Sequence, residues 1–175
     1  MIISLVGYMG SGKSHISKIL SKSLGYELID LDSEIARKNQ RSVAQIFEKK
    51  GELYFRKAER EVLEETLARK TNCVLSVGGG TPAYFNNMEV INSNTVSFYL
   101  RAPVSLLTER LLRNKQKRPL IAGIADENLS EFVAKHLFER SAYYNMARFT
   151  IDTNAKTPEN ICAEIIEKAS ECGNF

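Results

Sequence analysis

The residues with the clearest chemical meaning lie near the amino terminus, where Gly7 to Ser14 read Gly-Tyr-Met-Gly-Ser-Gly-Lys-Ser. This stretch matches the phosphate-binding pattern G-x-x-x-x-G-K-[ST] and directly follows the apolar run Ile2–Val6. We expect a buried strand, a turn through the glycines and a helix that begins at about Lys13. Backbone N–H groups in such a turn can cradle phosphates, and the helix N-terminus adds partial positive charge. The motif in this context predicts a site for a nucleoside triphosphate.

Individual side chains of this loop have separate expected roles. Lys13 supplies a mobile cation for the phosphate that is transferred, and the Ser14 hydroxyl can ligate Mg²⁺. The backbone of Gly10, Ser11 and Gly12 completes the cradle, because the glycines allow the N–H groups to point into one concavity.

Two aspartates, Asp30 and Asp32, end the second strand-like run. Strand alternation would send both carboxylates to the same side, at the carboxyl edge beside the phosphate loop. One could then hold the hydration shell of Mg²⁺ while the other faces a substrate hydroxyl. The alternative is that they cap the next helix, with Asp32-Ser33-Glu34 at its start, and the two roles are compatible.

Three consecutive glycines, Gly78, Gly79 and Gly80, follow the strand-like run Cys73–Val77. Such a run buries no side chain and costs backbone entropy, so close approach of a ligand to the backbone is a natural reason for it. A simple tight turn is the alternative.

Two other classes of phosphate-loop protein lose support. A guanine-selective switch needs Asn-Lys-x-Asp, but Asn114-Lys115-Gln116-Lys117 lacks the acid. An ATP-driven machine needs an acidic residue at the end of a hydrophobic strand, whereas the run Cys73–Val77 leads into glycines.

Bulk composition indicates a soluble globular protein of one domain, with 175 residues, 43% hydrophobic and 26% charged. The formal net charge of +3 is modest, and we interpret it as a solvated surface rather than a nucleic-acid site. The three cysteines show no C-x-x-C spacing and the first apolar run is short. We therefore expect a cytoplasmic protein that binds neither nucleic acid nor membrane.

Strand-like runs alternate with helical patterns, which predicts an α/β fold with a parallel sheet and ligands at the carboxyl ends of its strands. Residues 32–72 and 112–126 exceed a minimal crossover, and we expect a helical substrate-binding insertion and a loop-like, basic lid, respectively. The expected strands are Ile2–Val6, Glu27–Asp30, Cys73–Val77, Thr95–Leu100 and Phe149–Ile151.

Six motifs in order and at matching separations resemble the shikimate kinases, which are small relatives of the nucleoside-monophosphate kinases. The resemblance covers essentially the whole chain. The motifs are the phosphate loop, Asp30-x-Asp32, Phe55-Arg56-x-x-Glu59, Gly78-Gly79-Gly80, Arg118-Pro119-Leu120 and Arg140-x-x-x-Tyr144.

This resemblance implies a three-layer P-loop fold with strand order 2-3-1-4-5 and ATP-dependent phosphorylation of the 3-hydroxyl of shikimate, on the route to chorismate and aromatic amino acids. It implies that Arg56 and Arg140 bind the shikimate carboxylate and that Glu59 orients the arginines. Asp32 would bind the ring hydroxyls and accept or orient the hydroxyl proton. Gly78 to Gly80 would pack against the ring. We expect a monomer with ATP and shikimate as its ligands.

The resemblance also implies contacts to the nucleotide. Arg118 would sit on the lid and, with Lys13 and Mg²⁺, stabilise the γ-phosphoryl charge; Ser14 and, through water, Asp30 would serve the metal. Ser76 lies nearby, in the place of an acidic ligand. Adenine would lie between a lid-side arginine and the loop at Thr157-Pro158.

The chain departs from the family pattern at three places. His15 stands where Ser or Thr is usual and would contact the α-phosphate at most. The adenine-stacking arginine aligns near Leu111, so Arg110 and Arg113 are both candidates. Ala142 replaces a common proline after the substrate arginine.

Two alternative functions remain open at the level of sequence. One is a kinase of the same build that acts on gluconate or a nucleoside monophosphate. The other is a non-catalytic nucleotide-binding module whose partner surface is formed by residues 32–72.

Overall fold

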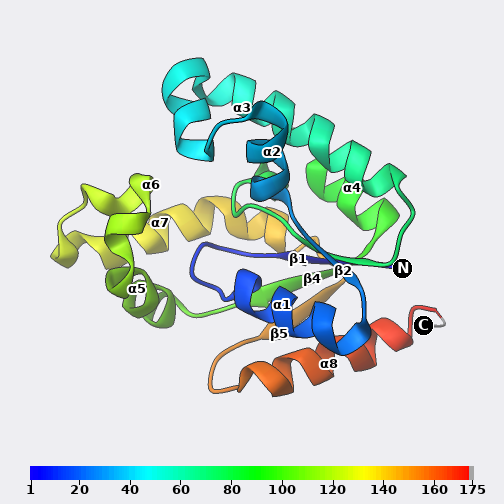
Figure 1. The fold of residues 1–175 in the computed structure, drawn as a ribbon. Coiled ribbons are helices and arrows are strands. Elements are labelled where there is room, and N and C mark those ends of the chain that lie inside the picture. The colour runs from blue at the N-terminus through cyan, green and yellow to red at the C-terminus, as the bar shows by residue number, and fades with distance from the viewer. Residues whose placement is uncertain (174–175) are drawn as a thin grey trace.

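The computed structural model describes residues 1–173, except the side chain of Lys117, and its five strands form one parallel sheet (Figure 1). The order is β2-β3-β1-β4-β5, and every pairing is parallel, which confirms the predicted fold and strand order. The strands are β1 (Ile2–Val6), β2 (Glu27–Asp30), β3 (Cys73–Ser76), β4 (Val96–Arg101) and β5 (Phe149–Asp152).

Three of the expected strands differ from the observed ones by a single residue at one or both ends. The start of β4 has a clear physical cause. Thr95 belongs to the end of the preceding helix, because its hydroxyl donates a hydrogen bond of 2.8 Å to the carbonyl of Ile91. The strand therefore begins at Val96 and continues to Arg101.

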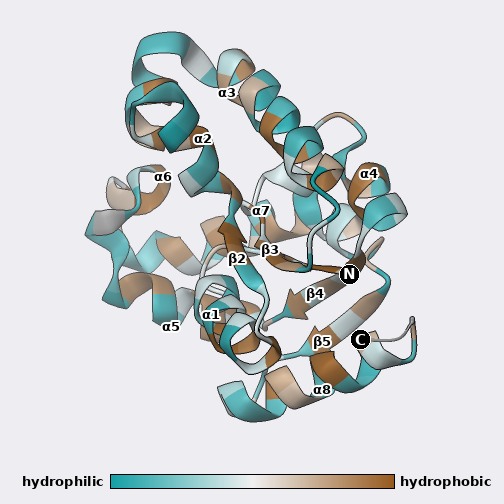
Figure 2. Cartoon of the chain, turned by 45° about the vertical axis from the view of Figure 1, so that its right-hand side comes forward, coloured by the Kyte–Doolittle hydropathy of each residue, from teal (hydrophilic) through white to brown (hydrophobic). Residues whose placement is uncertain are grey.

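Helices cover both faces of the sheet, as Figure 1 shows. Alternation along β1 explains the two layers, since Ile3 and Leu5 pack with one core cluster whereas Ile2 and Val6 pack with the other. The cluster of Ile3 and Leu5 includes residues of α1 (Lys13–Leu24) and α8 (Pro158–Ser170). The cluster of Ile2 and Val6 includes residues of five helices on the other face, namely α2 (Leu31–Asn39), α3 (Val43–Ala68), α4 (Asn87–Asn94), α5 (Val104–Arg113) and α7 (Asp126–Tyr144). Figure 2 shows brown, hydrophobic segments in the central strands and much teal on α2 and α3.

Glycines delimit α1 at both ends. Gly12, with φ of 102°, precedes the first helical residue, Lys13, and Gly25 ends the helix in the left-handed conformation with φ of 67°. The predicted start at Lys13 and stop at Gly25 are thus confirmed.

Residues 32–72 are almost entirely helical, as predicted, and form most of α2 and α3. The start of α3 is fixed by a capping box, in which Ser42 and Gln45 exchange side-chain and backbone hydrogen bonds. At Gly51, φ of 77° and ψ of 172° break the helical conformation, so α3 consists of two helical pieces joined by a kink.

The segment 112–126 contains two short helical turns, η2 (Lys115–Lys117) and α6 (Pro119–Ala122), so its expected loop-like character is only partly right. Arg118 lies between them in an extended conformation, with φ of −126° and ψ of 98°. The following proline explains this, because its ring disfavours a helical conformation in the residue before it.

The register of the sheet determines where the functional segments leave it. Ser76 at the end of β3 is paired with both Asp30 of β2 and Leu5 of β1. The phosphate loop, the start of α2 and the glycine run therefore emerge side by side from the carboxyl edge. None of the helices in residues 1–173 combines the length and apolar character needed to cross a membrane.

Candidate active site

The phosphate loop wraps around the N-terminus of α1, as the motif predicts. Gly10, with φ of 83°, lies against the side chain of Leu111, and Ser11 is buried. The Ser11 hydroxyl has no hydrogen-bond partner within the described part of the chain. Ser14 and His15 are exposed in the first turn of α1. A buried hydroxyl without a partner next to a helix N-terminus is suited to an anionic ligand.

Lys13 is buried in the middle of this loop. Its ammonium donates hydrogen bonds to the carbonyls of Gly7, at 2.6 Å, and Tyr8, at 3.0 Å. The pKa of Lys13 is lowered to about 8, mainly by burial and also by the charge of Arg118, against the opposing effect of the charge of Asp32. The predicted lysine, aspartate and lid arginine are therefore close enough to influence one another.

Asp30 and Asp32 are positioned differently from the strand-based expectation. The strand ends at Asp30, and Asp32 lies in the first turn of α2, so alternation along a strand does not relate their side chains. Asp30, rather than Asp32, caps the helix, because its Oδ1 accepts hydrogen bonds from the Ser33 amide and hydroxyl, both at 3.0 Å.

Asp32 lies in an environment that disfavours its charge. Burial above all, together with the neighbouring charges of Asp30 and Glu59, raises the pKa of Asp32 to about 6, against the opposing effects of Lys13 and Arg56. The carboxyl group can thus exchange a proton near neutral pH, which suits a group that accepts or orients a hydroxyl proton.

Arg56 on α3 is held on several sides. Its Nη1 donates to Glu59 Oε2 at 2.8 Å, and its guanidinium lies 3.8 Å from the centre of the Tyr84 ring. Nε and Nη2 both lie 3.5 Å from Glu52 Oε1, which makes a long ion pair with this edge, while the buried Nε has no hydrogen-bond partner in the described chain. The Nε–Nη2 edge of the guanidinium is the edge that pairs with a carboxylate in a bidentate manner.

The side chains of Asp32 and Arg56 explain the glycines at positions 78 and 80. A Cβ atom at Gly78 would lie 2.9 Å from Asp32 Oδ1, and one at Gly80 would lie 2.7 Å from Arg56 Nη2. The side chains of Asp32 and Arg56 thus explain why these positions lack a Cβ atom, and the expected approach of a ligand to this backbone stays a prediction. Gly79 accepts a hydrogen bond of 2.5 Å at its carbonyl from the buried Tyr144 hydroxyl.

Arg140 lies on α7, one turn before Tyr144, and is half-buried. The Tyr84 hydrogen bond, together with the charges of Arg56 and Arg140, lowers the pKa of Glu52. The two arginines from distant segments are thus near the same carboxylate of α3.

The two candidate adenine arginines occupy different places on α5. Arg110 donates a hydrogen bond of 3.1 Å to the Gly10 carbonyl of the phosphate loop, whereas Arg113 forms an exposed ion pair with Glu109. Thr157 is exposed at the start of α8, and its hydroxyl caps that helix by accepting from the Asn160 amide at 3.2 Å.

Sequence reasoning missed several contacts in this region. They are the stacking of Tyr84 on Arg56, the hydrogen bond from Thr81 to Glu59, and the pairing of Tyr8 with His136. Tyr8 and His136 are 128 residues apart. Nothing in the sequence pairs them.

No group of three or more His, Cys, Asp or Glu side chains within residues 1–173 is arranged to hold a metal ion. Ser14 and Asp30 are the side chains beside the loop with suitable oxygen ligands.

A glycine-rich loop at a helix N-terminus, with a buried lysine inside it, at the carboxyl edge of a parallel sheet defines a P-loop protein. Comparison with known proteins specifies the group within this class. The sequence model of the family described as shikimate kinase matches residues 9–170, and this chain belongs to that family.

Relatives and solved structures agree with this assignment. A shikimate kinase of Flavobacterium psychrophilum is 44% identical over 164 residues, which cover 93% of this chain and 95% of the relative. The crystal structure of shikimate kinase from Bacteroides thetaiotaomicron matches with a TM-score of 0.88 at 31% identity, covering 98% of this chain and 97% of the other. The structure of shikimate kinase from Acinetobacter baumannii in complex with shikimate matches with a TM-score of 0.87 at 34% identity. The match covers 98% of this chain and 93% of the other.

Proposed function

We propose that this protein transfers the γ-phosphoryl group of ATP to the 3-hydroxyl of shikimate and thereby forms shikimate 3-phosphate for the chorismate pathway. Membership of the shikimate kinase family supports the activity, and the complex of the Acinetobacter baumannii relative supports shikimate as the acceptor. The geometry around Arg56 is the observation of this chain that carries the proposal.

Arg56 has the properties of an anchor for a small carboxylate. It is 9% exposed, and Glu59, Tyr84 and the backbone at Gly80 limit its movement. An arginine already fixed in this way loses little conformational entropy when it binds an anion. Nε makes no hydrogen bond and faces Glu52 only across a long ion pair of 3.5 Å, so it can supply one of the two donors of a bidentate pair to a ligand carboxylate that approaches more closely.

The remaining substrate contacts follow from the surroundings of Arg56. We assign the second carboxylate contact to Arg140 and the ring hydroxyls to Asp32. The backbone of Gly78, Gly79 and Gly80 forms the floor of this site. A ligand with one carboxylate and several hydroxyls matches two arginines and a carboxyl group with a raised pKa.

The nucleotide side of the site uses the phosphate loop. Lys13 and Arg118 would balance the charge on the transferred group, and the amides from Gly10 to Ser14, with His15 beside them, would surround the phosphates. Ser14 and, through water, Asp30 would hold Mg²⁺, which when bound neutralises phosphate charge. Phosphoryl transfer needs mainly positioning and charge stabilisation, and these residues supply both.

We assign the stacking contact with adenine to Arg110 rather than to Arg113. Arg110 is partly buried against the phosphate loop, whereas Arg113 points its charge to Glu109 on the surface. Thr157 would lie on the opposite side, contributing its backbone, because its hydroxyl is engaged at the start of α8. The monomeric state, the cytoplasmic location and the absence of nucleic-acid and membrane binding stay predictions.

The direct test is an ADP-release assay in which ATP and Mg²⁺ are held constant and the acceptor is varied among shikimate, gluconate, AMP and CMP. We expect turnover with shikimate only, and a three-bond phosphorus coupling at ring position 3 of the product. Lys13→Ala serves as the negative control and should reduce kcat by on the order of 10²-fold or more.

The same assay distinguishes the alternatives. Turnover with gluconate or a nucleoside monophosphate, and none with shikimate, would replace the proposed substrate. ATP binding with no acceptor-dependent release of ADP would instead indicate a non-catalytic nucleotide-binding module.

A further inference from the structure

Glu59 is the buried group that determines the orientation of Arg56. It is only 1% exposed, and its two oxygens have different donors. Oε2 accepts from Arg56 Nη1 at 2.8 Å, and Oε1 accepts from the Thr81 hydroxyl at 2.6 Å. A hydroxyl-to-carboxylate hydrogen bond of this length is charge-assisted and strong. Thr81 therefore controls which way the Glu59 carboxylate faces.

Thr81 is itself fixed by a second buried side chain. It is fully buried in η1 (Thr81–Ala83), directly after Gly80, and its carbonyl accepts a hydrogen bond of 2.9 Å from Asn87 Nδ2. Asn87 is also fully buried, and its Oδ1 accepts from Arg60 Nη1 at 3.0 Å.

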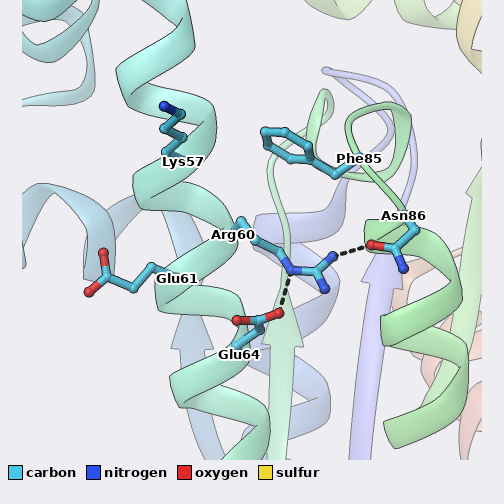
Figure 3. A pocket seen from close by; sticks show the side chains of 6 residues that line it. All are labelled: Lys57, Arg60, Glu61, Glu64, Phe85 and Asn86. Carbon is cyan, nitrogen blue, oxygen red and sulfur yellow. Dashed lines mark hydrogen bonds and ion pairs between the residues drawn. The ribbon is translucent and has the colours of Figure 1, made fainter.

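Arg60 connects this buried pair to the surface between α3 and α4, where Figure 3 shows it between Asn86 and Glu64. It donates to Asn86 Oδ1 at 2.7 Å and to Glu64 Oε1 at 2.6 Å. A continuous set of hydrogen bonds thus runs from the surface through Asn87 and Thr81 to the substrate side of α3.

We infer that Thr81 is a positioning residue for substrate binding, which acts through Glu59 to keep the Nε–Nη2 edge of Arg56 turned away from Glu59. Glu52 approaches that edge only to 3.5 Å, so a substrate carboxylate can compete for it. This inference rests on the proposed function, in which Arg56 binds that carboxylate. Without the Thr81 hydroxyl, Glu59 Oε1 would be buried and unsatisfied. The carboxylate could then turn toward Arg56 with both oxygens and occupy the donors that the substrate needs.

The test is Thr81→Val, which removes the hydroxyl while conserving volume. We expect the KM for shikimate to rise about ten-fold, with kcat within about three-fold and the KM for ATP unchanged. Thr81→Ser, which keeps the hydroxyl, should restore the KM. Thr81→Ala gives the same comparison if the valine variant does not fold.

The matched control is Thr66→Val on the same helix as Arg56. Thr66 is also buried, but its hydroxyl bonds to the carbonyl of Val62 within α3. Its replacement should lower stability without changing the KM for shikimate. An equal rise in KM for both valine variants, or no recovery with Thr81→Ser, would show that Thr81 has only a structural role.

A spectroscopic measurement separates this inference from the identity of the substrate. The ¹⁵N-bound proton at Arg56 Nε reports the position of the guanidinium directly, and it should shift in Thr81→Val and remain unchanged in Thr66→Val. An unchanged Nε signal in Thr81→Val overturns the inference whatever the enzyme phosphorylates. Failure of shikimate-dependent turnover in the unmodified protein would instead overturn the proposed function.

Discussion

The Tyr8 hydroxyl lies 2.8 Å from Nδ1 of His136, so a buried side chain of the phosphate loop is joined directly to helix α7. The two rings also pack edge to face, with centroids 5.5 Å apart. Tyr8 holds Lys13 through its carbonyl, and His136 lies one helical turn before Arg140. The contact therefore links the element proposed to bind ATP to the element proposed to bind the substrate carboxylate.

Tyr8→Phe should weaken this link and leave the ring packing intact. We expect the KM values for ATP and shikimate to rise together by a few-fold, and the melting temperature to fall by about 2–4 °C, since a half-buried histidine nitrogen loses its partner. Steady-state kinetics and thermal unfolding measure both effects. The control is Tyr143→Phe, at an exposed tyrosine of α7, the helix that carries His136. It should change neither the KM values nor the melting temperature. A Tyr8→Phe enzyme with unaltered KM values would contradict the proposed coupling.

ATP binding should depend on pH through Lys13. Burial lowers the pKa of its ammonium to about 8, and phosphate oxygens placed beside it would raise that pKa again. Binding above pH about 8 should therefore take up a proton, and the affinity for ATP should decrease as the pH rises through that value. Calorimetry in buffers with different heats of ionisation measures the proton uptake. Lys13→Met should bind ATP more weakly and without this uptake; the same uptake in that variant would assign the proton to another group.

Asp32→Asn should abolish turnover and stabilise the fold. Because the pKa of Asp32 rises from 3.8 to about 6, the folded protein keeps a proton that the unfolded chain releases between those values. The charged carboxylate therefore lowers stability above this pH window and has no such effect below it. We expect the melting temperature of Asp32→Asn to exceed that of the unmodified protein by a few degrees at neutral pH, and the difference to vanish near pH 4.

Asp30→Asn provides the comparison for this prediction. Asp30 caps α2, so the variant should gain no stability, and it should need more Mg²⁺ for full activity. Equal behaviour of the two variants would show that the division of roles between the aspartates is wrong.

Arg118→Ala should lower kcat by on the order of 10²-fold or more, while ATP binding to the free enzyme changes little, if residues 112–126 close as a lid. The control is Arg113→Ala, which removes an equal charge from the same region and should have little effect. Hydrogen exchange over this segment should slow when ADP and shikimate are both bound. Exchange that stays the same at saturation would argue against a lid.

Arg56→Lys and Arg140→Lys should raise the KM for shikimate more than they lower kcat. Lysine keeps the positive charge but loses the planar pair of donors that matches a carboxylate. The effect should be larger at Arg56, because Glu59 and Tyr84 are arranged around a guanidinium. Equal KM values in the lysine variants and the unmodified enzyme would remove both residues from the carboxylate site.

The sequence was sufficient for the fold and for the loop around Lys13, because the motif and its flanking strand and helix are local features. It was insufficient for Asp30 and Asp32, since the argument from strand alternation assumed a strand that continues past Asp30, whereas the chain turns into α2 at Leu31. The expected strand Glu27–Asp30 was right, but the helix that follows it directly makes Asp30 the capping residue.

Contacts between distant segments were also beyond the sequence. Arg110 and Arg113 look equivalent in the sequence, and only the packing of α5 against the phosphate loop distinguishes them. Thr81 and Glu59 are separated by 22 residues and meet only because η1 packs beside α3. Such pairings depend on the tertiary structure, which no local pattern encodes.

The glycines at positions 78 and 80 bear on how this family could lose its activity while keeping its fold. Each excludes a side chain because Asp32 or Arg56 occupies the space, so Gly78→Ala or Gly80→Ala could be tolerated after a second substitution that shortens the facing residue. Gly12, with φ of 102°, allows no such suppressor, because its requirement lies in its own backbone. A descendant that carries both members of a compensated pair would remain folded without its acid or its guanidinium. Paired changes at 78 with 32, or at 80 with 56, are therefore a sequence mark by which a pseudokinase of this lineage could be recognised.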